Sequence, residues 1–196
     1  MPNKIIRRPH ISWSQLSMWE NDPNGYKLRY VDNIPLPESQ SLKIGKYVAD
    51  ELEKKVSKDK LVEFLRMFSP TCELREEEFN VALGKIMLKG FMDGFNPSIP
   101  EIEEFKTGIN WTQGKVNKHG QLDFYALAYY LKYKSIPKVN LIWFRTARDS
   151  NGNIFLTGEL PVIFPREIKL RDILRMSARI KKADKEIQAM YDFLNE

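Results

Sequence analysis

Cysteine and histidine are scarce in this chain of 196 residues, which holds one cysteine, Cys72, and two histidines, His10 and His119. A single cysteine excludes an internal disulfide, a typical four-thiolate iron–sulfur cluster and a cysteine-rich zinc site. A metal ion must therefore be held by oxygen atoms or by the two histidines. Both histidines precede segments that we expect to be helical, where a solvated or helix-capping role is the ordinary one.

Long apolar runs are also absent. Charged residues interrupt the apolar stretches well before the roughly 20 residues needed to cross a bilayer, and the first ten residues lack the apolar region of a signal peptide. We therefore expect a cytoplasmic protein, bacterial or phage-encoded in the host cytoplasm. The sequence shows no low-complexity tract and no repeat of fixed period, and its length predicts a single domain, 1–196, with a substantial core.

The charge balance is basic, with a formal net charge of +5. An excess of this sign is compatible with nucleic-acid binding, although many basic proteins bind none. Basic and aromatic residues alternate in "YKLRY" (26–30) and "YYLKYK" (129–134), a mixture that can pair with phosphates and stack on unpaired bases. Most of these aromatic residues also suit a protein core.

Three helices are predicted in the first third of the chain. The first is short, is capped by Ser12 or Ser14, and is broken by the turn-forming residues 21–25. The other two are predicted from apolar residues at helical spacing, over 41–56 and 58–68. Pro70 then ends the helical region.

From Cys72 onward the apolar period changes to that of strands. Three extended segments follow, 72–83, 85–95 and 101–108, with a turn near Gly84 between the first two. Three consecutive strands of this kind predict a meander.

The second half of the chain alternates helices and strands. A long helix is predicted over 119–134 and a buried strand over 138–147. The sequence at 149–153 is a hairpin turn signal, and 154–164 is the predicted return strand. An amphipathic helix, 170–194, closes the chain. The order of elements predicts an α/β fold, a central mixed sheet flanked by helices.

Acidic residues stand at the ends of two of the predicted strands. If these strands pair, the carboxylates of Asp93 and Glu104 converge on one point, and Lys106 shares the face of Glu104 because it follows two residues later. A divalent cation would relieve the repulsion, and oxygen ligands favour Mg²⁺ or Mn²⁺. Such a group suits phosphodiester hydrolysis. The alternative is a solvated strand edge with Asp93 in a turn.

Three short motifs follow one another along this part of the chain, at 90–93, 104–108 and 121–125. In this order they resemble the Gly-x-x-Asp, Glu/Asp-x-Lys-Thr-Gly and Gln-x-x-x-Tyr motifs of the PD-(D/E)XK nuclease superfamily, in its RecB-like exonuclease branch. Each motif alone has little specificity. Their order, on elements that the sequence predicts independently, makes the resemblance specific.

The resemblance covers most of the chain up to about Tyr133. Residues 11–31 resemble the family's opening helix and the arm after it, and 44–53 resemble its first catalytic helix. The resemblance implies a restriction-endonuclease-like core with N-terminal helices. Within the single domain we expect a helical arm at about 1–70, the catalytic core at about 71–165 and the C-terminal helix at about 168–196.

The family's roles are implied residue by residue. Asp93 and Glu104 would be metal ligands, with the backbone carbonyl of Phe105 as a further ligand, and Lys106 would be the catalytic lysine. Gln121 and Tyr125 lie one helical turn apart, and would line the cleft and position the lysine or the DNA backbone. An alternative for Tyr125 is packing in the core.

One departure concerns the family's first motif, in which a glycine is followed four residues later by a metal-binding histidine. Here Gly45 is followed by Ala49, which has no ligand atom. Leu52 and Glu53 continue the pattern in register, so the histidine is lost naturally or by engineered inactivation. Asp50 points about 100° away around the helix, whereas Glu53 could approach the site. We therefore expect weak or absent nuclease activity.

A second departure concerns members of the family that carry an iron–sulfur cluster. In those, a cysteine precedes a proline near the N-terminus, whereas Asp22 precedes Pro23 here. The comparison is therefore with the branch that has no iron–sulfur cluster. The expected cofactor is Mg²⁺ or Mn²⁺.

DNA, as ends or single strands, is the expected substrate, and the resemblance implies a helicase or recombinase partner. Thr107, Gln121, Tyr125 and Trp111, which follows the Lys-Thr-Gly turn, are candidate DNA contacts. Basic residues on the last helix form either a solvated face or a DNA-binding stripe. Three functions stay open: a DNA exonuclease or end-processing nuclease in recombination, repair or phage DNA metabolism, a catalytically silent binding module derived from one, and an unrelated α/β protein.

Overall fold

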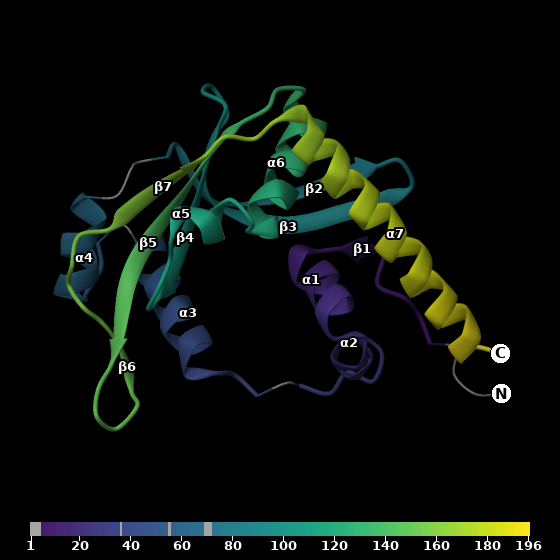
Figure 1. Cartoon of the computed structure of the whole chain (residues 1–196), viewed down its shortest axis with the longest axis horizontal. Coiled ribbons are helices and arrows are strands. Elements are labelled where there is room, and N and C mark those ends of the chain that lie inside the picture. The colour runs from purple at the N-terminus through teal and green to yellow at the C-terminus, as the bar shows by residue number, and fades with distance from the viewer. Residues whose placement is uncertain (1–4, 36, 55, 69–71) are drawn as a thin grey trace.

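The computed structural model describes residues 5–35, 37–54, 56–68 and 72–196 (Figure 1). Pro70, predicted to end the helical region, lies outside these residues. Within them, seven strands form a mixed sheet: β1 (His10–Ile11), β2 (Leu74–Leu83), β3 (Ile86–Asn96), β4 (Glu101–Gly108), β5 (Lys138–Arg148), β6 (Ile154–Leu156) and β7 (Val162–Arg166). The prediction of an α/β fold with a central mixed sheet is confirmed.

The predicted meander is also confirmed. Strands β2, β3 and β4 are antiparallel neighbours, and Gly84 adopts the left-handed conformation (φ 64°) in the tight turn between the first two. Strand β5 runs parallel to β4 and pairs with the whole length of β4, from Glu101↔Lys138 to Gly108↔Arg145. Parallel neighbours need a long crossover, which here contains helix α6 (Gly120–Tyr133).

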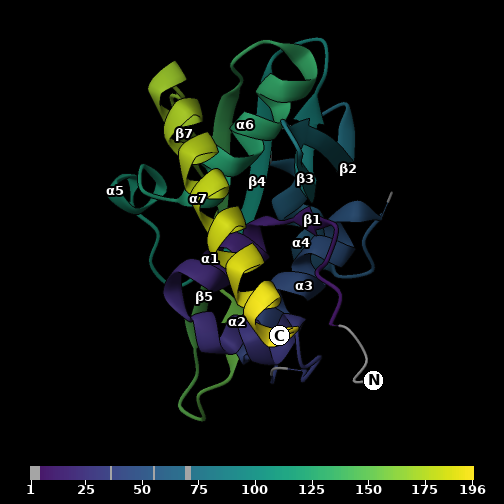
Figure 2. The same ribbon diagram turned by 90° about the vertical axis from the view of Figure 1, so that its right-hand side faces the viewer.

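Helices pack on the sheet in two groups (Figures 1 and 2). One apolar cluster joins the sheet to α6, α1 (Trp13–Asn21), α2 (Pro23–Tyr30) and the long helix α7 (Leu170–Leu194). A second cluster joins β4 and β5 to α3 (Gln40–Glu53) and α4 (Lys60–Met67), around the buried Ile142 and Phe144. No helix in the described part of the chain is long and apolar enough to span a membrane.

Helix α6 lies in the centre of the fold. Every residue from Leu122 to Tyr129 is buried, which is the pattern of a helix covered on all sides. The helix ends at Lys134, whose φ of 59° is left-handed. Leu131, in the last turn of the helix, is only partly buried. The central position of α6 fixes where its polar residues Gln121 and Asp123 can point.

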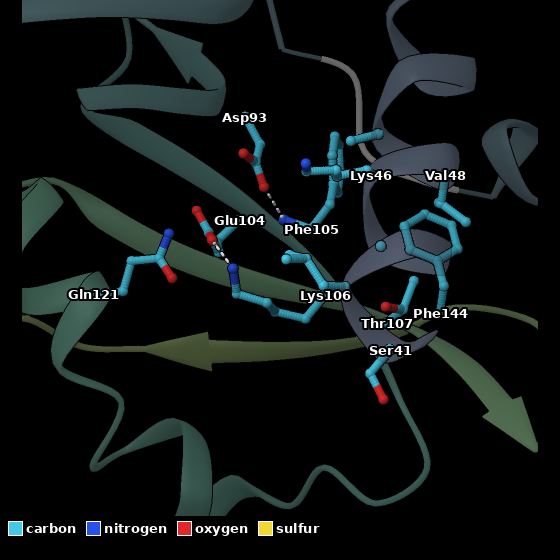
Figure 3. Close-up of a pocket in the computed structure, with 13 residues that line it drawn as sticks. Ser41, Lys46, Val48, Asp93, Glu104, Phe105, Lys106, Thr107, Gln121 and Phe144 are labelled. Atoms are coloured by element: carbon cyan, nitrogen blue, oxygen red, sulfur yellow. Dashed lines mark hydrogen bonds and ion pairs between the residues drawn. The ribbon is translucent and has the colours of Figure 1, made fainter. Parts of the chain in front are cut away.

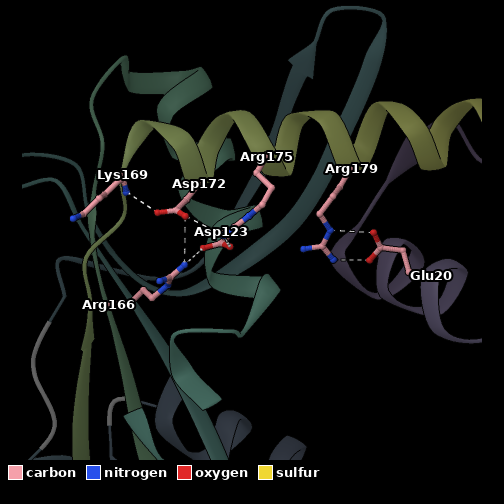
Figure 4. A network of polar contacts seen from close by, with 7 residues as sticks. All are labelled: Glu20, Asp123, Arg166, Lys169, Asp172, Arg175 and Arg179. Atoms are coloured by element: carbon pink, nitrogen blue, oxygen red, sulfur yellow. Dashed lines mark hydrogen bonds and ion pairs between the residues drawn. The ribbon is translucent and has the colours of Figure 1, made fainter. Parts of the chain in front are cut away.

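Helix α7 is tied to α6 and β7 by charged residues (Figure 4). Asp123 of α6 accepts hydrogen bonds from Arg166 at 2.7 Å and from Arg175 at 3.3 Å. Asp172 in turn accepts from Arg175 at 2.9 Å and from the Lys169 backbone N–H at 3.0 Å. Because both acids are buried, this network holds the last helix in one position.

The prediction of one continuous return strand over 154–164 is wrong. The segment is divided into β6 and β7, which pair with different parts of β5. Gly158 between them is left-handed (φ 79°) and Pro161 has no N–H to donate, so a continuous ladder cannot form there.

The helix predictions near the N-terminus need smaller corrections. Ser12 caps α1, with a side-chain oxygen accepting from Gln15 N–H, whereas Ser14 lies within the helix. The residues that break α1 also start α2, because Pro23 takes the first position of that helix and Asp22 caps it. Helix α2 was not predicted. Short helix α5 (Gln113–Val116) and strand β1 were not predicted either.

Candidate active site

The pairing of β3 with β4 stops at Gly94↔Glu103. Continuing the register by one step would pair Asp93 with Glu104, but there the two strands diverge. Asp93 Oδ2 instead accepts a hydrogen bond of 2.7 Å from the backbone N–H of Phe105 (Figure 3). The side-chain carboxylate thus replaces a ladder acceptor, and the two acids flank the opening that the divergence creates.

A cavity of about 470 Å³ lies at this opening, between α3 and the sheet. Most of the residues predicted for the site line it: Asp93, Glu104, Phe105, Lys106, Thr107 and Gln121. Helix α3 approaches closely because Gly45 has no side chain, since a Cβ there would lie 3.3 Å from Thr107 Oγ1. Ala49, one turn further along, lines the same cavity.

Glu104 is the most buried acid of the site, at 0% exposure. Its Oε1 accepts a hydrogen bond from Lys106 Nζ (Figure 3), whereas its Oε2 has no hydrogen-bond partner among the described residues. Burial, reinforced by the negative charge of Asp93, raises the pKa of Glu104 to about 8, against the opposing effect of Lys106. The site therefore lacks a donor or cation for one buried carboxylate oxygen.

Lys106 keeps its positive charge at this position. Burial lowers the pKa of the ammonium group, but Glu104 and Asp93 together outweigh burial and raise the pKa above its usual value. The lysine side chain lines the cavity and is 25% exposed, and its ammonium group is held by Glu104. A fixed cation beside two acids is an arrangement that can stabilise developing negative charge.

The donor atoms fit a hard divalent cation. Among the residues that the structure describes, no three His, Cys, Asp or Glu side chains lie close enough to hold a metal, so the side chains offer two carboxylates, Asp93 and Glu104. The Phe105 N–H points toward Asp93, and the carbonyl of a strand residue points to the same side as its N–H. Oxygen ligands of this kind favour hard divalent cations over softer metals.

Gln121 and Tyr125 connect the site to a second cavity of about 410 Å³ on the α1 side. Gln121 Nε2 donates to the Tyr125 hydroxyl oxygen at 2.8 Å, and Gln121 lines both cavities. Tyr125 is 7% exposed, and burial raises its pKa well above the usual value, so the hydroxyl is neutral. Tyr125 is thus part of the apolar core and also lines the second cavity, while its role in a catalytic site stays a prediction.

Two solved structures share this fold. A Eubacterium rectale protein that carries a provisional name as an exonuclease superposes with a TM-score of 0.61 at 11% identity, over 96% of this chain and 83% of that one. An alkaline exonuclease from Laribacter hongkongensis superposes with a TM-score of 0.54 at 8% identity, over 96% and 92%. No family model matches the sequence, and no curated protein is significantly similar to it. At these identities the likeness establishes the fold.

Trp111 lies outside the lining of both cavities. Its Nε1 donates to the Thr107 carbonyl at 3.4 Å, and its ring packs edge-on against His119. A DNA contact by Trp111 stays a prediction. His119 is at the N-cap of α6, but its side chain makes no capping hydrogen bond. Burial and the charge of Lys106 lower the pKa of His119 to about 4, so it is neutral at pH 7.

Two further charged residues near the site were not predicted from the sequence. Lys46 of α3 lines the cavity between α3 and the sheet. Glu76 has a left-handed φ of 48°, and the register on both sides of it places it opposite Asp93. Burial, followed by the charge of Asp93, raises the pKa of Glu76 to about 7. Its relation to Asp93 depends on the β2–β3 register, which no local pattern specifies.

Proposed function

We propose that this protein is a metal-dependent deoxyribonuclease that hydrolyses phosphodiester bonds at DNA ends, as an exonuclease or an end-processing enzyme. One observation carries the proposal: the buried Glu104, with an unpartnered oxygen, lies beside Asp93 and Lys106 in a cavity between α3 and the sheet. The exonuclease names of two proteins with the same fold support it. Recombination, repair or phage DNA metabolism is the proposed setting, with a helicase or recombinase as partner.

The proposed metal ligands are Asp93, Glu104 and the Phe105 carbonyl. A bound Mg²⁺ or Mn²⁺ would polarise the phosphoryl oxygens and lower the pKa of its water. The assignment to the cluster-free RecB-like branch belongs to the same proposal, because it rests on the order of the motifs.

The other residues of the site position the reactants. Lys106, held by Glu104 Oε1, orients the attacking water and offsets the negative charge of the transition state. Gln121 and Tyr125, joined by their hydrogen bond, hold the DNA backbone across the opening. Thr107 contacts the DNA from the edge of the cavity on the α3 side.

A second candidate function is a catalytically silent module that binds DNA or a partner protein. The observation that favours it is Ala49, which lines the catalytic cavity where the resembling family has a histidine ligand. With fewer ligands the metal binds more weakly, and cleavage slows accordingly. The two candidates share the same site and differ in the rate of reaction.

Calorimetric titration with Mn²⁺ tests the site, and cleavage of end-labelled oligonucleotides tests the reaction. We expect Asp93→Ala to abolish measurable Mn²⁺ binding and Lys106→Ala to retain it while slowing cleavage by about a hundredfold or more. Glu159→Ala, which removes an exposed acid paired with Arg145, is the matched control and should change neither. Unchanged Mn²⁺ binding by Asp93→Ala would overturn the proposal, and metal binding without any cleavage would favour the silent module.

A further inference from the structure

The second cavity, on the α1 side, adjoins the catalytic cavity directly. Asp93 and Gln121 line both, so the two volumes meet at the proposed metal site. Its other walls come from β1, the start of α1 and β3, through residues that have no role in the proposed chemistry: His10, Ser12, Trp13, Ser14, Lys89 and Phe91. A strand of nucleic acid held over Asp93 therefore has space on both sides of the reacting phosphate.

Phe91 is an exposed aromatic residue in the lining of this cavity. The side chain is 46% exposed although it lies in the middle of β3, between the buried Leu88 and the buried Phe95. A large ring left in water beside a cavity offers a flat face to a ligand. Nucleic-acid bases stack on such faces whatever their sequence.

The polar residues of the cavity suit a phosphate. Lys89 Nζ pairs with Glu78 at 2.7 Å, but the two side chains are 38% and 46% exposed, and such exposed pairs are weak. The ammonium group can therefore turn to a phosphate at little cost. The Ser12 and Ser14 hydroxyl groups lie 3.0 Å apart at the same wall. Asp93 is the sole acid in the described lining, and it lies at the junction with the catalytic cavity.

We propose that the second cavity binds one unpaired nucleotide adjacent to the scissile phosphate, with its base on Phe91 and its phosphate at Lys89 and the serine hydroxyls. A volume of about 410 Å³ is near the lower limit of ligand pockets, and it accommodates a nucleotide but not a base pair. The substrate is therefore a single strand or a frayed end. This assignment rests on the proposed nuclease function and deepens it by naming the form of DNA.

Fluorescence of 2-aminopurine tests the stacking directly. The base analogue is placed at successive positions of a short single-stranded oligonucleotide, which is bound in Ca²⁺, and fluorescence anisotropy gives its affinity. We expect quenching at one position in the unmodified protein, loss of that quenching in Phe91→Ala, and an affinity roughly 5- to 100-fold weaker. Lys89→Ala should weaken binding and keep the quenching.

The matched control is Phe155→Ala, because Phe155 has the same exposed fraction, 46%, but lies on β6. Three results would overturn the subsite. They are quenching that persists in Phe91→Ala, an equal loss of quenching in Phe155→Ala, and quenching that is as strong with a duplex as with the single strand. If Asp93→Ala still abolishes Mn²⁺ binding in that case, the subsite fails and the proposed function stands. If Mn²⁺ binding is also unaffected by Asp93→Ala, both fail together.

Discussion

The charged cluster around Asp123 and the one around Glu104 contain the same kinds of side chain, but they are completed differently. In the first, both oxygens of Asp123 accept from arginines, Arg166 and Arg175, and Asp172 accepts from Arg175 and a backbone N–H (Figure 4). Acids and arginines are equal in number, so charge is balanced within the protein.

The cluster around Glu104 is not balanced in this way. Lys106 donates a hydrogen bond to Glu104 and lies close enough to interact with the charge of Asp93, whereas Glu104 Oε2 has no partner among the described residues. The two clusters are separated by α6, since Asp123 lies about 200° around that helix from Gln121 and from Tyr125. Asp123, on one side of α6, thus belongs to a network in which its oxygens are paired, whereas Gln121 and Tyr125 face the cavities near Glu104, one oxygen of which has no partner among the described residues.

The largest expected effect comes from opening the closed cluster. Asp123→Ala leaves Arg166, whose side chain is 11% exposed, without its nearest acid. We expect the free energy of unfolding to fall by about 3–5 kcal/mol, measured by urea denaturation. The control is Glu20→Ala, which breaks the more exposed ion pair between Glu20 and Arg179 of α7 and should lower the free energy of unfolding by about 1 kcal/mol or less. Equal costs for the two variants would show that the buried network contributes nothing particular.

The second prediction concerns the pH dependence of the open cluster. The pKa of Glu104 is about 8 in the folded protein against 4.5 as the ordinary value, so the folded state binds the extra proton between these limits. The contribution of Glu104 to the free energy of unfolding is then complete at pH values below the unfolded pKa. It falls as pH rises toward 8, by at most about 1.4 kcal/mol per pH unit. Glu104→Gln should remove that slope.

Urea denaturation of both proteins at several pH values, in the presence of EDTA, measures the difference. Parallel pH profiles would contradict the prediction. If Glu104 is a metal ligand, as proposed, a bound Mn²⁺ would displace its proton in the same window, so the affinity of the unmodified protein for Mn²⁺ should rise with pH up to about 8.

The smallest expected effect comes from adding a ligand to the open cluster. Ala49→His introduces an imidazole at a position that already lines the cavity between α3 and the sheet. We expect Mn²⁺ affinity to rise about tenfold, or about 1.4 kcal/mol, with a parallel gain in cleavage. Asp50→His, one residue away on an exposed part of α3, is the control and should give no gain. If the two variants behave alike, Ala49 is not the position of a lost ligand.

Local sequence patterns were sufficient for the regular elements and for the order of the site residues. The bounds 170–194 predicted for the last helix are those of α7, because its apolar residues keep a helical period over the whole length. The strand segment 101–108 is likewise β4. Glu104 and Lys106 are on this strand at a spacing of two, which a sequence states directly.

Turn residues with two roles explain the local errors. Pro23 and Asp22 end one helix and start the next, and a pattern that only marks breaks misses α2. Gly158 and Pro161 divide the predicted return strand, because they interrupt the ladder without removing the strand-forming residues around them.

The sequence by itself determined which residues carry charge, which segments are strands and helices, and that Asp93 and Glu104 lie on consecutive strands, because these properties depend on neighbours along the chain. The prediction that both acids stand at strand ends is wrong for Glu104, which is the fourth of the eight residues of β4. Only the tertiary structure decided that β3 and β4 diverge there, that Glu104 keeps one oxygen without a partner, and that Arg166 neutralises Asp123 from 43 residues away. Strand register and the burial of charge are set by contacts between distant segments.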